Sequence, residues 1–206
     1  MSNEYLTIKE EVIAQIEVEK SKFICYLYPC DNEEDAKSIL KDIRKQHPKA
    51  NHHCYAYIYN NGTYYKSSDD GEPGGTAGMP ILNVLKAKNF NNIIAIVVRY
   101  FGGTLLGRGG LIRAYTHATE KGIENAQIYA EGFKRIYSIT VDFSFYDIVN
   151  QRLNHPSLKI IDREFNEKVT VKVILLDEFD FNNIVDLTNG NAIINDEGES
   201  LYTYRV

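Results

Sequence analysis

Two glycine-rich stretches of the sequence carry the residues best suited to bind a ligand. The first, SSDDGEPGGTAGMPIL, spans residues 67–82, and the second, RYFGGTLLGRGGLIRAY, spans residues 99–115. Glycine adopts backbone angles with positive φ and lets a partner approach the main chain closely. The two stretches therefore predict either a backbone cradle for a ligand or a pair of long, irregular turns.

The second stretch predicts an anion-binding site. It connects an apolar segment to a helical pattern, so its backbone N–H groups and the helix dipole would favour negative charge. Its spacing is close to that of a nucleotide P-loop, but that motif requires Lys and then Ser or Thr where Arg108 and Gly109 stand. The alternative is that the glycines only let strand and helix pack closely. The predicted anion- or nucleic-acid-binding residues are Arg99, Gly102, Gly103, Gly107, Arg108, Gly109, Gly110 and Arg113.

The first stretch adds three carboxylates, Asp69, Asp70 and Glu72. Carboxylates can serve as general acids or bases, or hold a hard metal ion. They can also accept hydrogen bonds from the N–H groups of their own loop. A third possibility is that Arg99 or Arg113 pairs with one of them and draws the first loop over the second. The candidate residues of this loop are Asp69, Asp70, Gly71, Glu72, Gly74, Gly75 and Thr76.

Cysteine and histidine residues give no standard metal signature. The residues that come into question are Cys25, Cys30, His52, His53 and Cys54. Their spacing fits no standard zinc finger, and no motif marks a nucleophile. We therefore predict no catalytic residue, no metal site and no cofactor, and we expect a binding protein rather than an enzyme. His117 follows the second stretch and could assist Arg113 in binding an anion.

Alternating tyrosines form a further candidate surface. In an extended strand the side chains of every second residue share one face. The tyrosines that alternate in this way are Tyr26, Tyr28, Tyr55, Tyr57 and Tyr59. With helices on only the other side of the sheet, they would form an open aromatic face on which bases can stack. The alternative is that tyrosine simply suits half-buried strands.

Composition and charge narrow the class of protein. The hydrophobic fraction of 44% in 206 residues is enough for a core, and no run of eighteen apolar residues predicts a membrane span. Three cysteines and an N-terminus without a signal pattern favour the cytoplasm. The net charge is −5, yet residues 78–121 hold six basic residues and one acidic residue, a local charge of +5 around the second glycine stretch.

The first part of the chain predicts an α+β domain over residues 1–128. Strands are expected at about 12–18 and 22–28, followed by a helix in NEEDAKSILKDIRKQHP, which Asn32 can cap. CYAYIY and TYYKS, joined by Asn60-Asn61-Gly62, predict a hairpin. MPILNVLKAK favours a short helix, NIIAIVVRY a buried strand, and residues 110–125 a helix.

Residues 129–206 predict a second domain with the element order βαββαβ. This order is typical of a small ferredoxin-like fold. Its strands are expected in KRIYSITVDF, LKIIDREF, KVTVKVILL and the final segment, and its helices in FYDIVNQRLNH and FDFNNIVDLTNG. The predicted core consists of Ile139, Val141, Ile148, Leu153, Ile160, Val171, Val173 and Val185.

The two glycine-rich stretches also carry a family resemblance. DDGEPGGTAGMPIL and IAIVVRYFGGTLLGRGGLIRAY resemble the signature stretches of the IMPACT family, in particular its bacterial YigZ-type members. The resemblance covers nearly the whole chain. It implies an N-terminal domain similar to domain 2 of ribosomal protein S5, and a ferredoxin-like C-terminal domain that resembles domains of translation elongation factor G. It transfers no catalytic residue.

The resemblance and the basic segment together suggest what the chain binds. We expect an RNA- or ribosome-associated protein, or a partner of a translation-associated protein, with a role in regulating translation or the stress response. One alternative is an enzyme or sensor that holds a phosphorylated small molecule or nucleotide at the two glycine-rich loops. Another is a protein–protein adaptor. The sequence does not indicate an oligomeric state.

Overall fold

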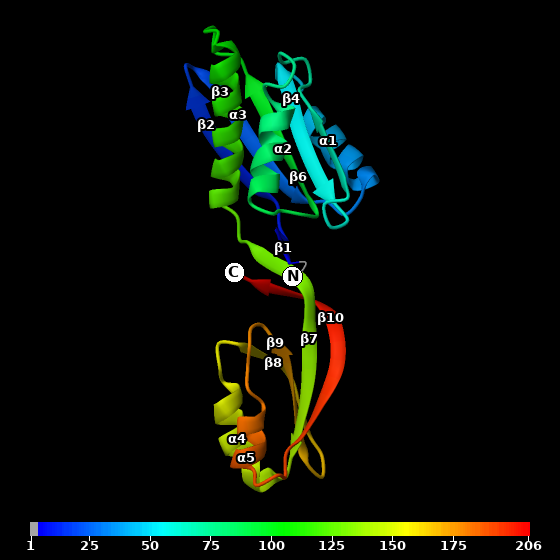
Figure 1. Cartoon of the computed structure of the whole chain (residues 1–206). Coiled ribbons are helices and arrows are strands. Elements are labelled where there is room, and N and C mark those ends of the chain that lie inside the picture. The colour runs from blue at the N-terminus through cyan, green and yellow to red at the C-terminus, as the bar shows by residue number, and fades with distance from the viewer. Residues whose placement is uncertain (1–3) are drawn as a thin grey trace. The chain divides into compact units, whose positions relative to one another are not determined.

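The computed structural model describes residues 4–206, and these form two compact units (Figure 1). The first unit comprises residues 4–131 and 203–206, and the second comprises residues 132–202. The last four residues thus belong to the first unit. The sequence predicts a domain boundary between residues 128 and 129. That an independently folding domain begins there stays a prediction. Within residues 4–206 no helix is both long and apolar enough to cross a membrane.

The first unit is built on a five-stranded antiparallel sheet with the strand order β2-β3-β6-β4-β5. Its elements, in chain order, are β1 (Tyr5–Thr7), β2 (Val12–Val18), β3 (Ser21–Pro29), α1 (Glu33–Gln46), β4 (His52–Tyr59), β5 (Tyr64–Ser68), α2 (Gly78–Ala87), β6 (Ile93–Tyr100) and α3 (Gly107–Glu124). The predicted strands, hairpin and helices of this part are confirmed. The short strand β1, which pairs with β7, was not predicted.

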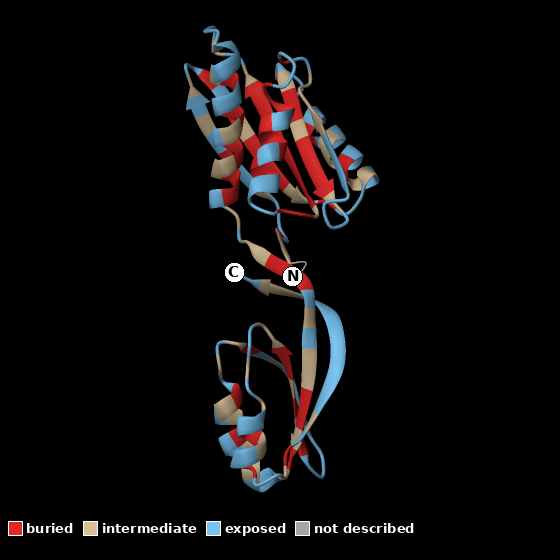
Figure 2. Ribbon diagram, in the orientation of Figure 1, coloured by how far each residue is buried: buried red, intermediate tan, exposed pale blue. Residues whose placement is uncertain are grey.

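Helices cover both faces of this sheet, so the central strand is enclosed (Figure 2). Residues 93–98 of β6 are all buried, as their continuous apolar run predicts. Helices α2 and α3 pack on one face, where Tyr115 contacts the ring of Phe23 edge to face. Helix α1 packs on the other face through Ala36 and Ile43. Its first turn is capped by the Asn32 side chain, which accepts the Asp35 N–H at 2.9 Å.

The second unit has the predicted element order. After the connecting strand β7 (Tyr129–Val141) come a 3₁₀ turn η1 (Phe143–Phe145), α4 (Tyr146–Leu153), β8 (Leu158–Phe165), β9 (Val169–Leu175), α5 (Asn182–Leu187) and β10 (Ile193–Arg205). The strand order is β10-β7-β9-β8. The start of β7 pairs with β1, whereas residues 136–141 pair with β9.

The core of the second unit differs from the prediction in both helices. Val149 and Ile184 are fully buried, whereas the predicted Ile148 is 40% exposed and Val185 is only partly buried. Adjacent helical residues lie about 100° apart around the axis. Because both members of each pair are apolar, the periodicity alone could not tell which one faces the sheet.

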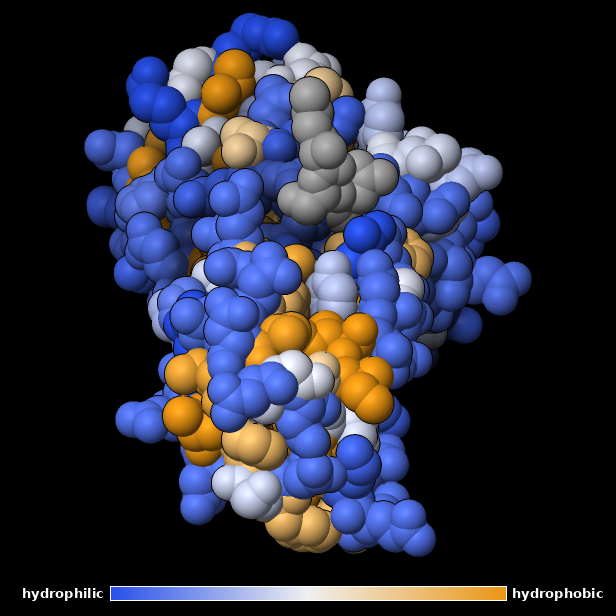
Figure 3. Space-filling model, turned by 60° about the horizontal axis from the view of Figure 1, so that its bottom comes forward, coloured by the Kyte–Doolittle hydropathy of each residue, from blue (hydrophilic) through white to orange (hydrophobic). Residues whose placement is uncertain are grey.

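Not all apolar side chains are buried. Figure 3 shows an area of the molecular surface where apolar side chains gather.

Candidate ligand-binding site

Asp69 organises the first glycine-rich loop, which connects β5 to α2. Its carboxylate accepts backbone N–H groups from Gly75 at 2.8 Å, and from Ala77 and Gly78 at 2.9 Å each. Burial works to raise the pKa of Asp69, but these three donors and the nearby Arg108 charge outweigh it, so the pKa lies below its ordinary value. Asp69 therefore holds the loop in shape.

Asp70 ties the same loop to its neighbours. Its backbone is in the left-handed region, with φ of 44°. Its carboxylate accepts the backbone N–H of His53 at 2.7 Å and pairs with Arg44 of α1. Its carbonyl oxygen is 2.9 Å from Nδ1 of His52. These contacts fix the loop against β4 and α1.

Glu72 joins the first loop to β6 through a buried ion pair. Its Oε1 accepts Nη1–H of Arg99 at 2.7 Å and the hydroxyl of Tyr115 at 2.7 Å. Arg99 is 5% exposed and Glu72 is 8% exposed. A pairing of Arg99 with a carboxylate of the first loop was one of the three roles that the sequence allowed for these carboxylates. All three carboxylates of the loop are thus engaged by protein donors.

Arg99 keeps one donor free although it is almost fully buried. Its Nη2 donates to the hydroxyl of Ser21 at 3.3 Å, and its guanidinium lies 5.4 Å from the ring centre of Phe23 and 5.6 Å from that of Phe101. Its Nε has no hydrogen-bond partner among the described residues. A buried donor of this kind is unusual, because protein interiors satisfy most polar groups.

A hollow of about 480 Å³ lies between the two glycine-rich loops, and we call it the inter-loop hollow. The start of α3 and Arg108 border it. Arg108 is exposed, and its Nη2 donates to the carbonyl of Gly74 at 2.9 Å. The lining residues are Asn51, His52, Glu72, Pro73, Arg99, Phe101, Leu105, Leu106, Gly107, Arg108 and Leu111.

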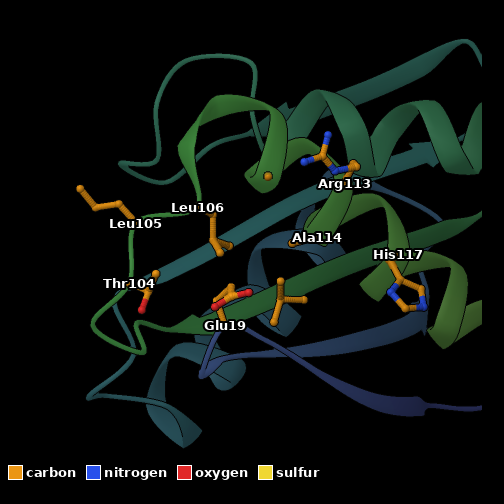
Figure 4. Close-up of a pocket in the computed structure, with 9 residues that line it drawn as sticks. Glu19, Thr104, Leu105, Leu106, Arg113, Ala114 and His117 are labelled. Atoms are coloured by element: carbon orange, nitrogen blue, oxygen red, sulfur yellow. The ribbon is translucent and has the colours of Figure 1, made fainter.

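Arg113 lines a different hollow of about 560 Å³ (Figure 4), which shares Leu105 and Leu106 with the inter-loop hollow. Arg113 and His117 come from the same helix, α3, and both are exposed. Glu19 and Thr104 line this second hollow as well. The structure therefore brings Arg99 and Arg108 together and separates Arg113 from them. The association of Arg113 with His117 agrees with their sequence spacing.

The glycines of the second stretch serve two different purposes. A Cβ on Gly102 would lie 2.1 Å from the backbone carbon of Lys20, so this position is needed for close packing against the β2–β3 turn. Gly107 has φ of +68° and open space where a Cβ would stand. Gly102 thus serves close packing, whereas an anion-binding role of the loop stays a prediction. Among the other candidates, Gly103, Gly109 and Gly110 lie around the start of α3, while Gly71, Gly74, Gly75 and Thr76 belong to the first loop.

The alternating tyrosines lie on the face of the sheet that α1 covers. The residues Tyr26 and Tyr57 are each only 6% exposed, and they pack in one cluster with Tyr28, Tyr55 and Tyr59. The predicted condition for an open aromatic face, helices on one side only, is not met. A stacked row nevertheless continues along β4 to Tyr64 of β5, which is 53% exposed.

Sequence reasoning missed several residues of this site. Asn51, His52 and Phe101 line the inter-loop hollow, and Ser21 and Tyr115 support the buried ion pair. Tyr115 appears in the sequence analysis only as the end of the second glycine-rich stretch. His52 was considered only as a metal ligand. No local signal marks their roles, because each depends on contacts between segments far apart in the chain.

The comparisons with known proteins agree with the glycine-rich signatures. The family model of the Impact N-terminal domain matches residues 19–123. The chain is 36% identical to IMPACT family member YvyE of Bacillus subtilis over 98% of this chain and 94% of that protein. It is 34% identical to IMPACT family member YigZ of Escherichia coli, over 77% of this chain and 79% of that one.

A solved structure supports the architecture. The crystal structure of a hypothetical protein superposes with a TM-score of 0.60 at 29% sequence identity, covering 94% of this chain and 97% of the other. Two relatives at or above 34% identity each match more than two thirds of the chain, and the family model matches half of it. The chain therefore belongs to the IMPACT family.

Proposed function

We propose that this chain is an RNA- or ribosome-associated protein that acts in regulating translation or the stress response, and that it contacts RNA phosphates at the inter-loop hollow. One observation carries the proposal. Arg108 stands exposed at the start of α3, and within residues 4–206 no salt bridge includes it. The charge of Arg99 in the same hollow is balanced by Glu72. Arg108 is therefore the cation there that remains available to a phosphate.

The surrounding charge favours the same partner. The stretch of residues 78–121, with its net charge of +5, contains α2, β6 and most of α3, and its cations other than the buried Arg99 lie outside the Glu72 ion pair. Most of the affinity of proteins for nucleic acid comes from the phosphate backbone, so a locally basic surface matters more than the net charge of −5. We also propose that the protein is cytoplasmic, because its three cysteines are too few for a disulfide framework.

Two finer fold assignments belong to the proposal. We infer that the second unit is ferredoxin-like, since it combines the order βαββαβ with the strand order β10-β7-β9-β8. We assign the first unit to the fold of ribosomal protein S5 domain 2 from the family resemblance. Both folds occur in translation components, which supports the proposed role by analogy alone.

A phosphorylated small molecule is the second candidate ligand. The inter-loop hollow favours it, because a volume of about 480 Å³ suits a compact ligand. A third candidate role is that of an adaptor for another protein, which two exposed apolar side chains that line the same hollow, Phe101 (45% exposed) and Leu105 (88% exposed), favour.

The proposal is tested by titrating the full chain with single-stranded RNA at several salt concentrations. Binding is expected to weaken steeply as salt rises, and Arg108→Glu should weaken it by about 1–3 kcal/mol and flatten the salt slope. Lys41→Glu, an equal charge change on exposed α1, is the matched control and should have little effect. Binding that is absent, or that ignores both salt and Arg108→Glu, would refute the proposal.

A further inference from the structure

We propose that the inter-loop hollow binds a nucleoside monophosphate unit, with its phosphate at Arg108 and the start of α3 and its base against the apolar wall beside Phe101. This inference rests on the proposed function and makes it specific. The unit can be a free nucleotide or the phosphorylated end of an RNA, because both present the same chemistry to the hollow.

The size of the hollow suits a single nucleotide. A volume of about 480 Å³ lies within the range of small-molecule sites in proteins. The walls come from two loops that Asp69 and the Glu72–Arg99 pair hold in place, so the hollow exists before a ligand arrives.

The phosphate end is marked by donors that lack partners. The first N–H groups of a helix have no carbonyl within the helix to bind, and Leu106, at the N-cap position of α3, provides no side-chain cap. A helix start alone would not identify a site. Arg99 also lines this hollow and is 5% exposed, and its buried Nε–H has no partner among the described residues, so the wall here holds an unsatisfied cationic donor.

The charge of the hollow also suits a phosphate. Glu72 would repel an anion on its own, but it is engaged by Arg99 and by the Tyr115 hydroxyl. Arg108, whose charge also acts on Asp69, places a further positive charge beside the helix start. Arg108 now donates to the carbonyl oxygen of Gly74, an uncharged acceptor, and this bond is exposed, so a ligand oxygen can replace it. An anionic oxygen would form the stronger, charge-assisted bond.

The apolar part of the wall suits a flat aromatic base. Phe101 is 45% exposed, and its backbone N–H donates to the Asn51 side chain at 2.8 Å, which holds this residue at the rim. Leu105 and Leu111 continue the apolar wall. Stacking and apolar contact accept any base, so we expect little preference among the four bases.

His52 adds a polar group to the hollow. Its Nδ1 lies 2.9 Å from the carbonyl oxygen of Asp70, and a carbonyl can only accept, so His52 donates from Nδ1. Its Nε2 remains for a ligand and is 3.9 Å from Glu72 Oε1. The second hollow lacks this combination, because no buried arginine lines it and because its acid, Glu19, is in no salt bridge within residues 4–206.

The experiment is calorimetric titration of the full chain with adenosine 5′-monophosphate, adenosine and inorganic phosphate. The monophosphate is expected to bind about tenfold or more tightly than either fragment, because only it engages both the phosphate donors and the apolar part of the wall. Arg108→Glu and Phe101→Ala should each weaken it by about tenfold. Arg113→Glu is the matched control on the same helix and should leave binding unchanged. Thermal melts of each variant verify that it is folded.

Two further arms identify the source of the ligand. A short single-stranded RNA with a 5′-phosphate, compared with the same RNA ending in a 5′-hydroxyl, should bind more tightly if RNA ends are the ligand, whereas equal binding of both points to free nucleotides. The inference is overturned if the monophosphate binds no better than phosphate, or if Arg113→Glu weakens it as much as Arg108→Glu. Salt-dependent RNA binding without nucleotide binding would leave the proposed function standing and remove only this inference.

Discussion

Replacing Glu72 by glutamine tests whether the buried ion pair holds the two loops together. The substitution keeps the shape of the side chain and removes its charge. Arg99, only 5% exposed, would then stay buried without a counter-charge. Breaking a buried pair from one side typically costs about 3–5 kcal/mol, since the remaining charge is desolvated and unpaired.

The contacts of Glu72 support a loss of unfolding free energy of about 3–5 kcal/mol for Glu72→Gln. The pair is joined at 2.7 Å, and Tyr115 donates to the same Oε1 at 2.7 Å, so its hydrogen bond also loses a charged acceptor. For a chain of this length, each kcal/mol lowers the melting temperature by about 2–4 °C. We therefore expect the first unit of Glu72→Gln to melt about 6–20 °C below the native protein.

The assay is urea and thermal unfolding followed by circular dichroism. Arg108→Gln serves as the exposed control and should change stability by no more than about 0.5 kcal/mol. The double variant Arg99→Met, Glu72→Leu should recover most of the loss, because it removes both buried charges together. Exposed ion pairs contribute less than about 1 kcal/mol to stability. If Glu72→Gln lowers the free energy of unfolding by less than that, the reasoning is refuted.

Two more predictions concern the loops. Gly102→Ala would place a Cβ 2.1 Å from the Lys20 backbone and should cost about 1–3 kcal/mol in the urea midpoint analysis, whereas Gly74→Ala, with nothing within 4 Å, should be nearly neutral; equal effects would contradict the packing role. The lowered pKa of Asp69 adds stability that is present above its ordinary pKa of about 4 and is lost as the pH falls through its folded-state pKa. Unfolding midpoints measured between neutral and strongly acidic pH should therefore fall less for Asp69→Asn than for the native chain, and identical acid profiles would disprove this contribution.

The sequence by itself determined those elements whose signals are local. The cap at Asn32, the acidic first turn and the apolar spacing of Ala36 and Ile43 predicted α1, because capping and periodicity act within a few residues. The continuous apolar run of β6 likewise predicted an enclosed strand. The glycine-rich signatures predicted the family, which the comparisons then showed.

Only the tertiary structure decided which of these residues meet. Three acids and two arginines allowed several pairings, and the fold chose Glu72 with Arg99, 27 positions apart. Arg108 and Arg113 are close in sequence, yet they line different hollows, which share Leu105 and Leu106. The strand β1 forms by pairing with distant segments, with β7, as in Tyr5 opposite Glu131, and with the chain at Phe90 through Leu6. Such contacts depend on how distant segments pack, and since many pairings satisfy the same local preferences, the sequence pattern alone does not distinguish them.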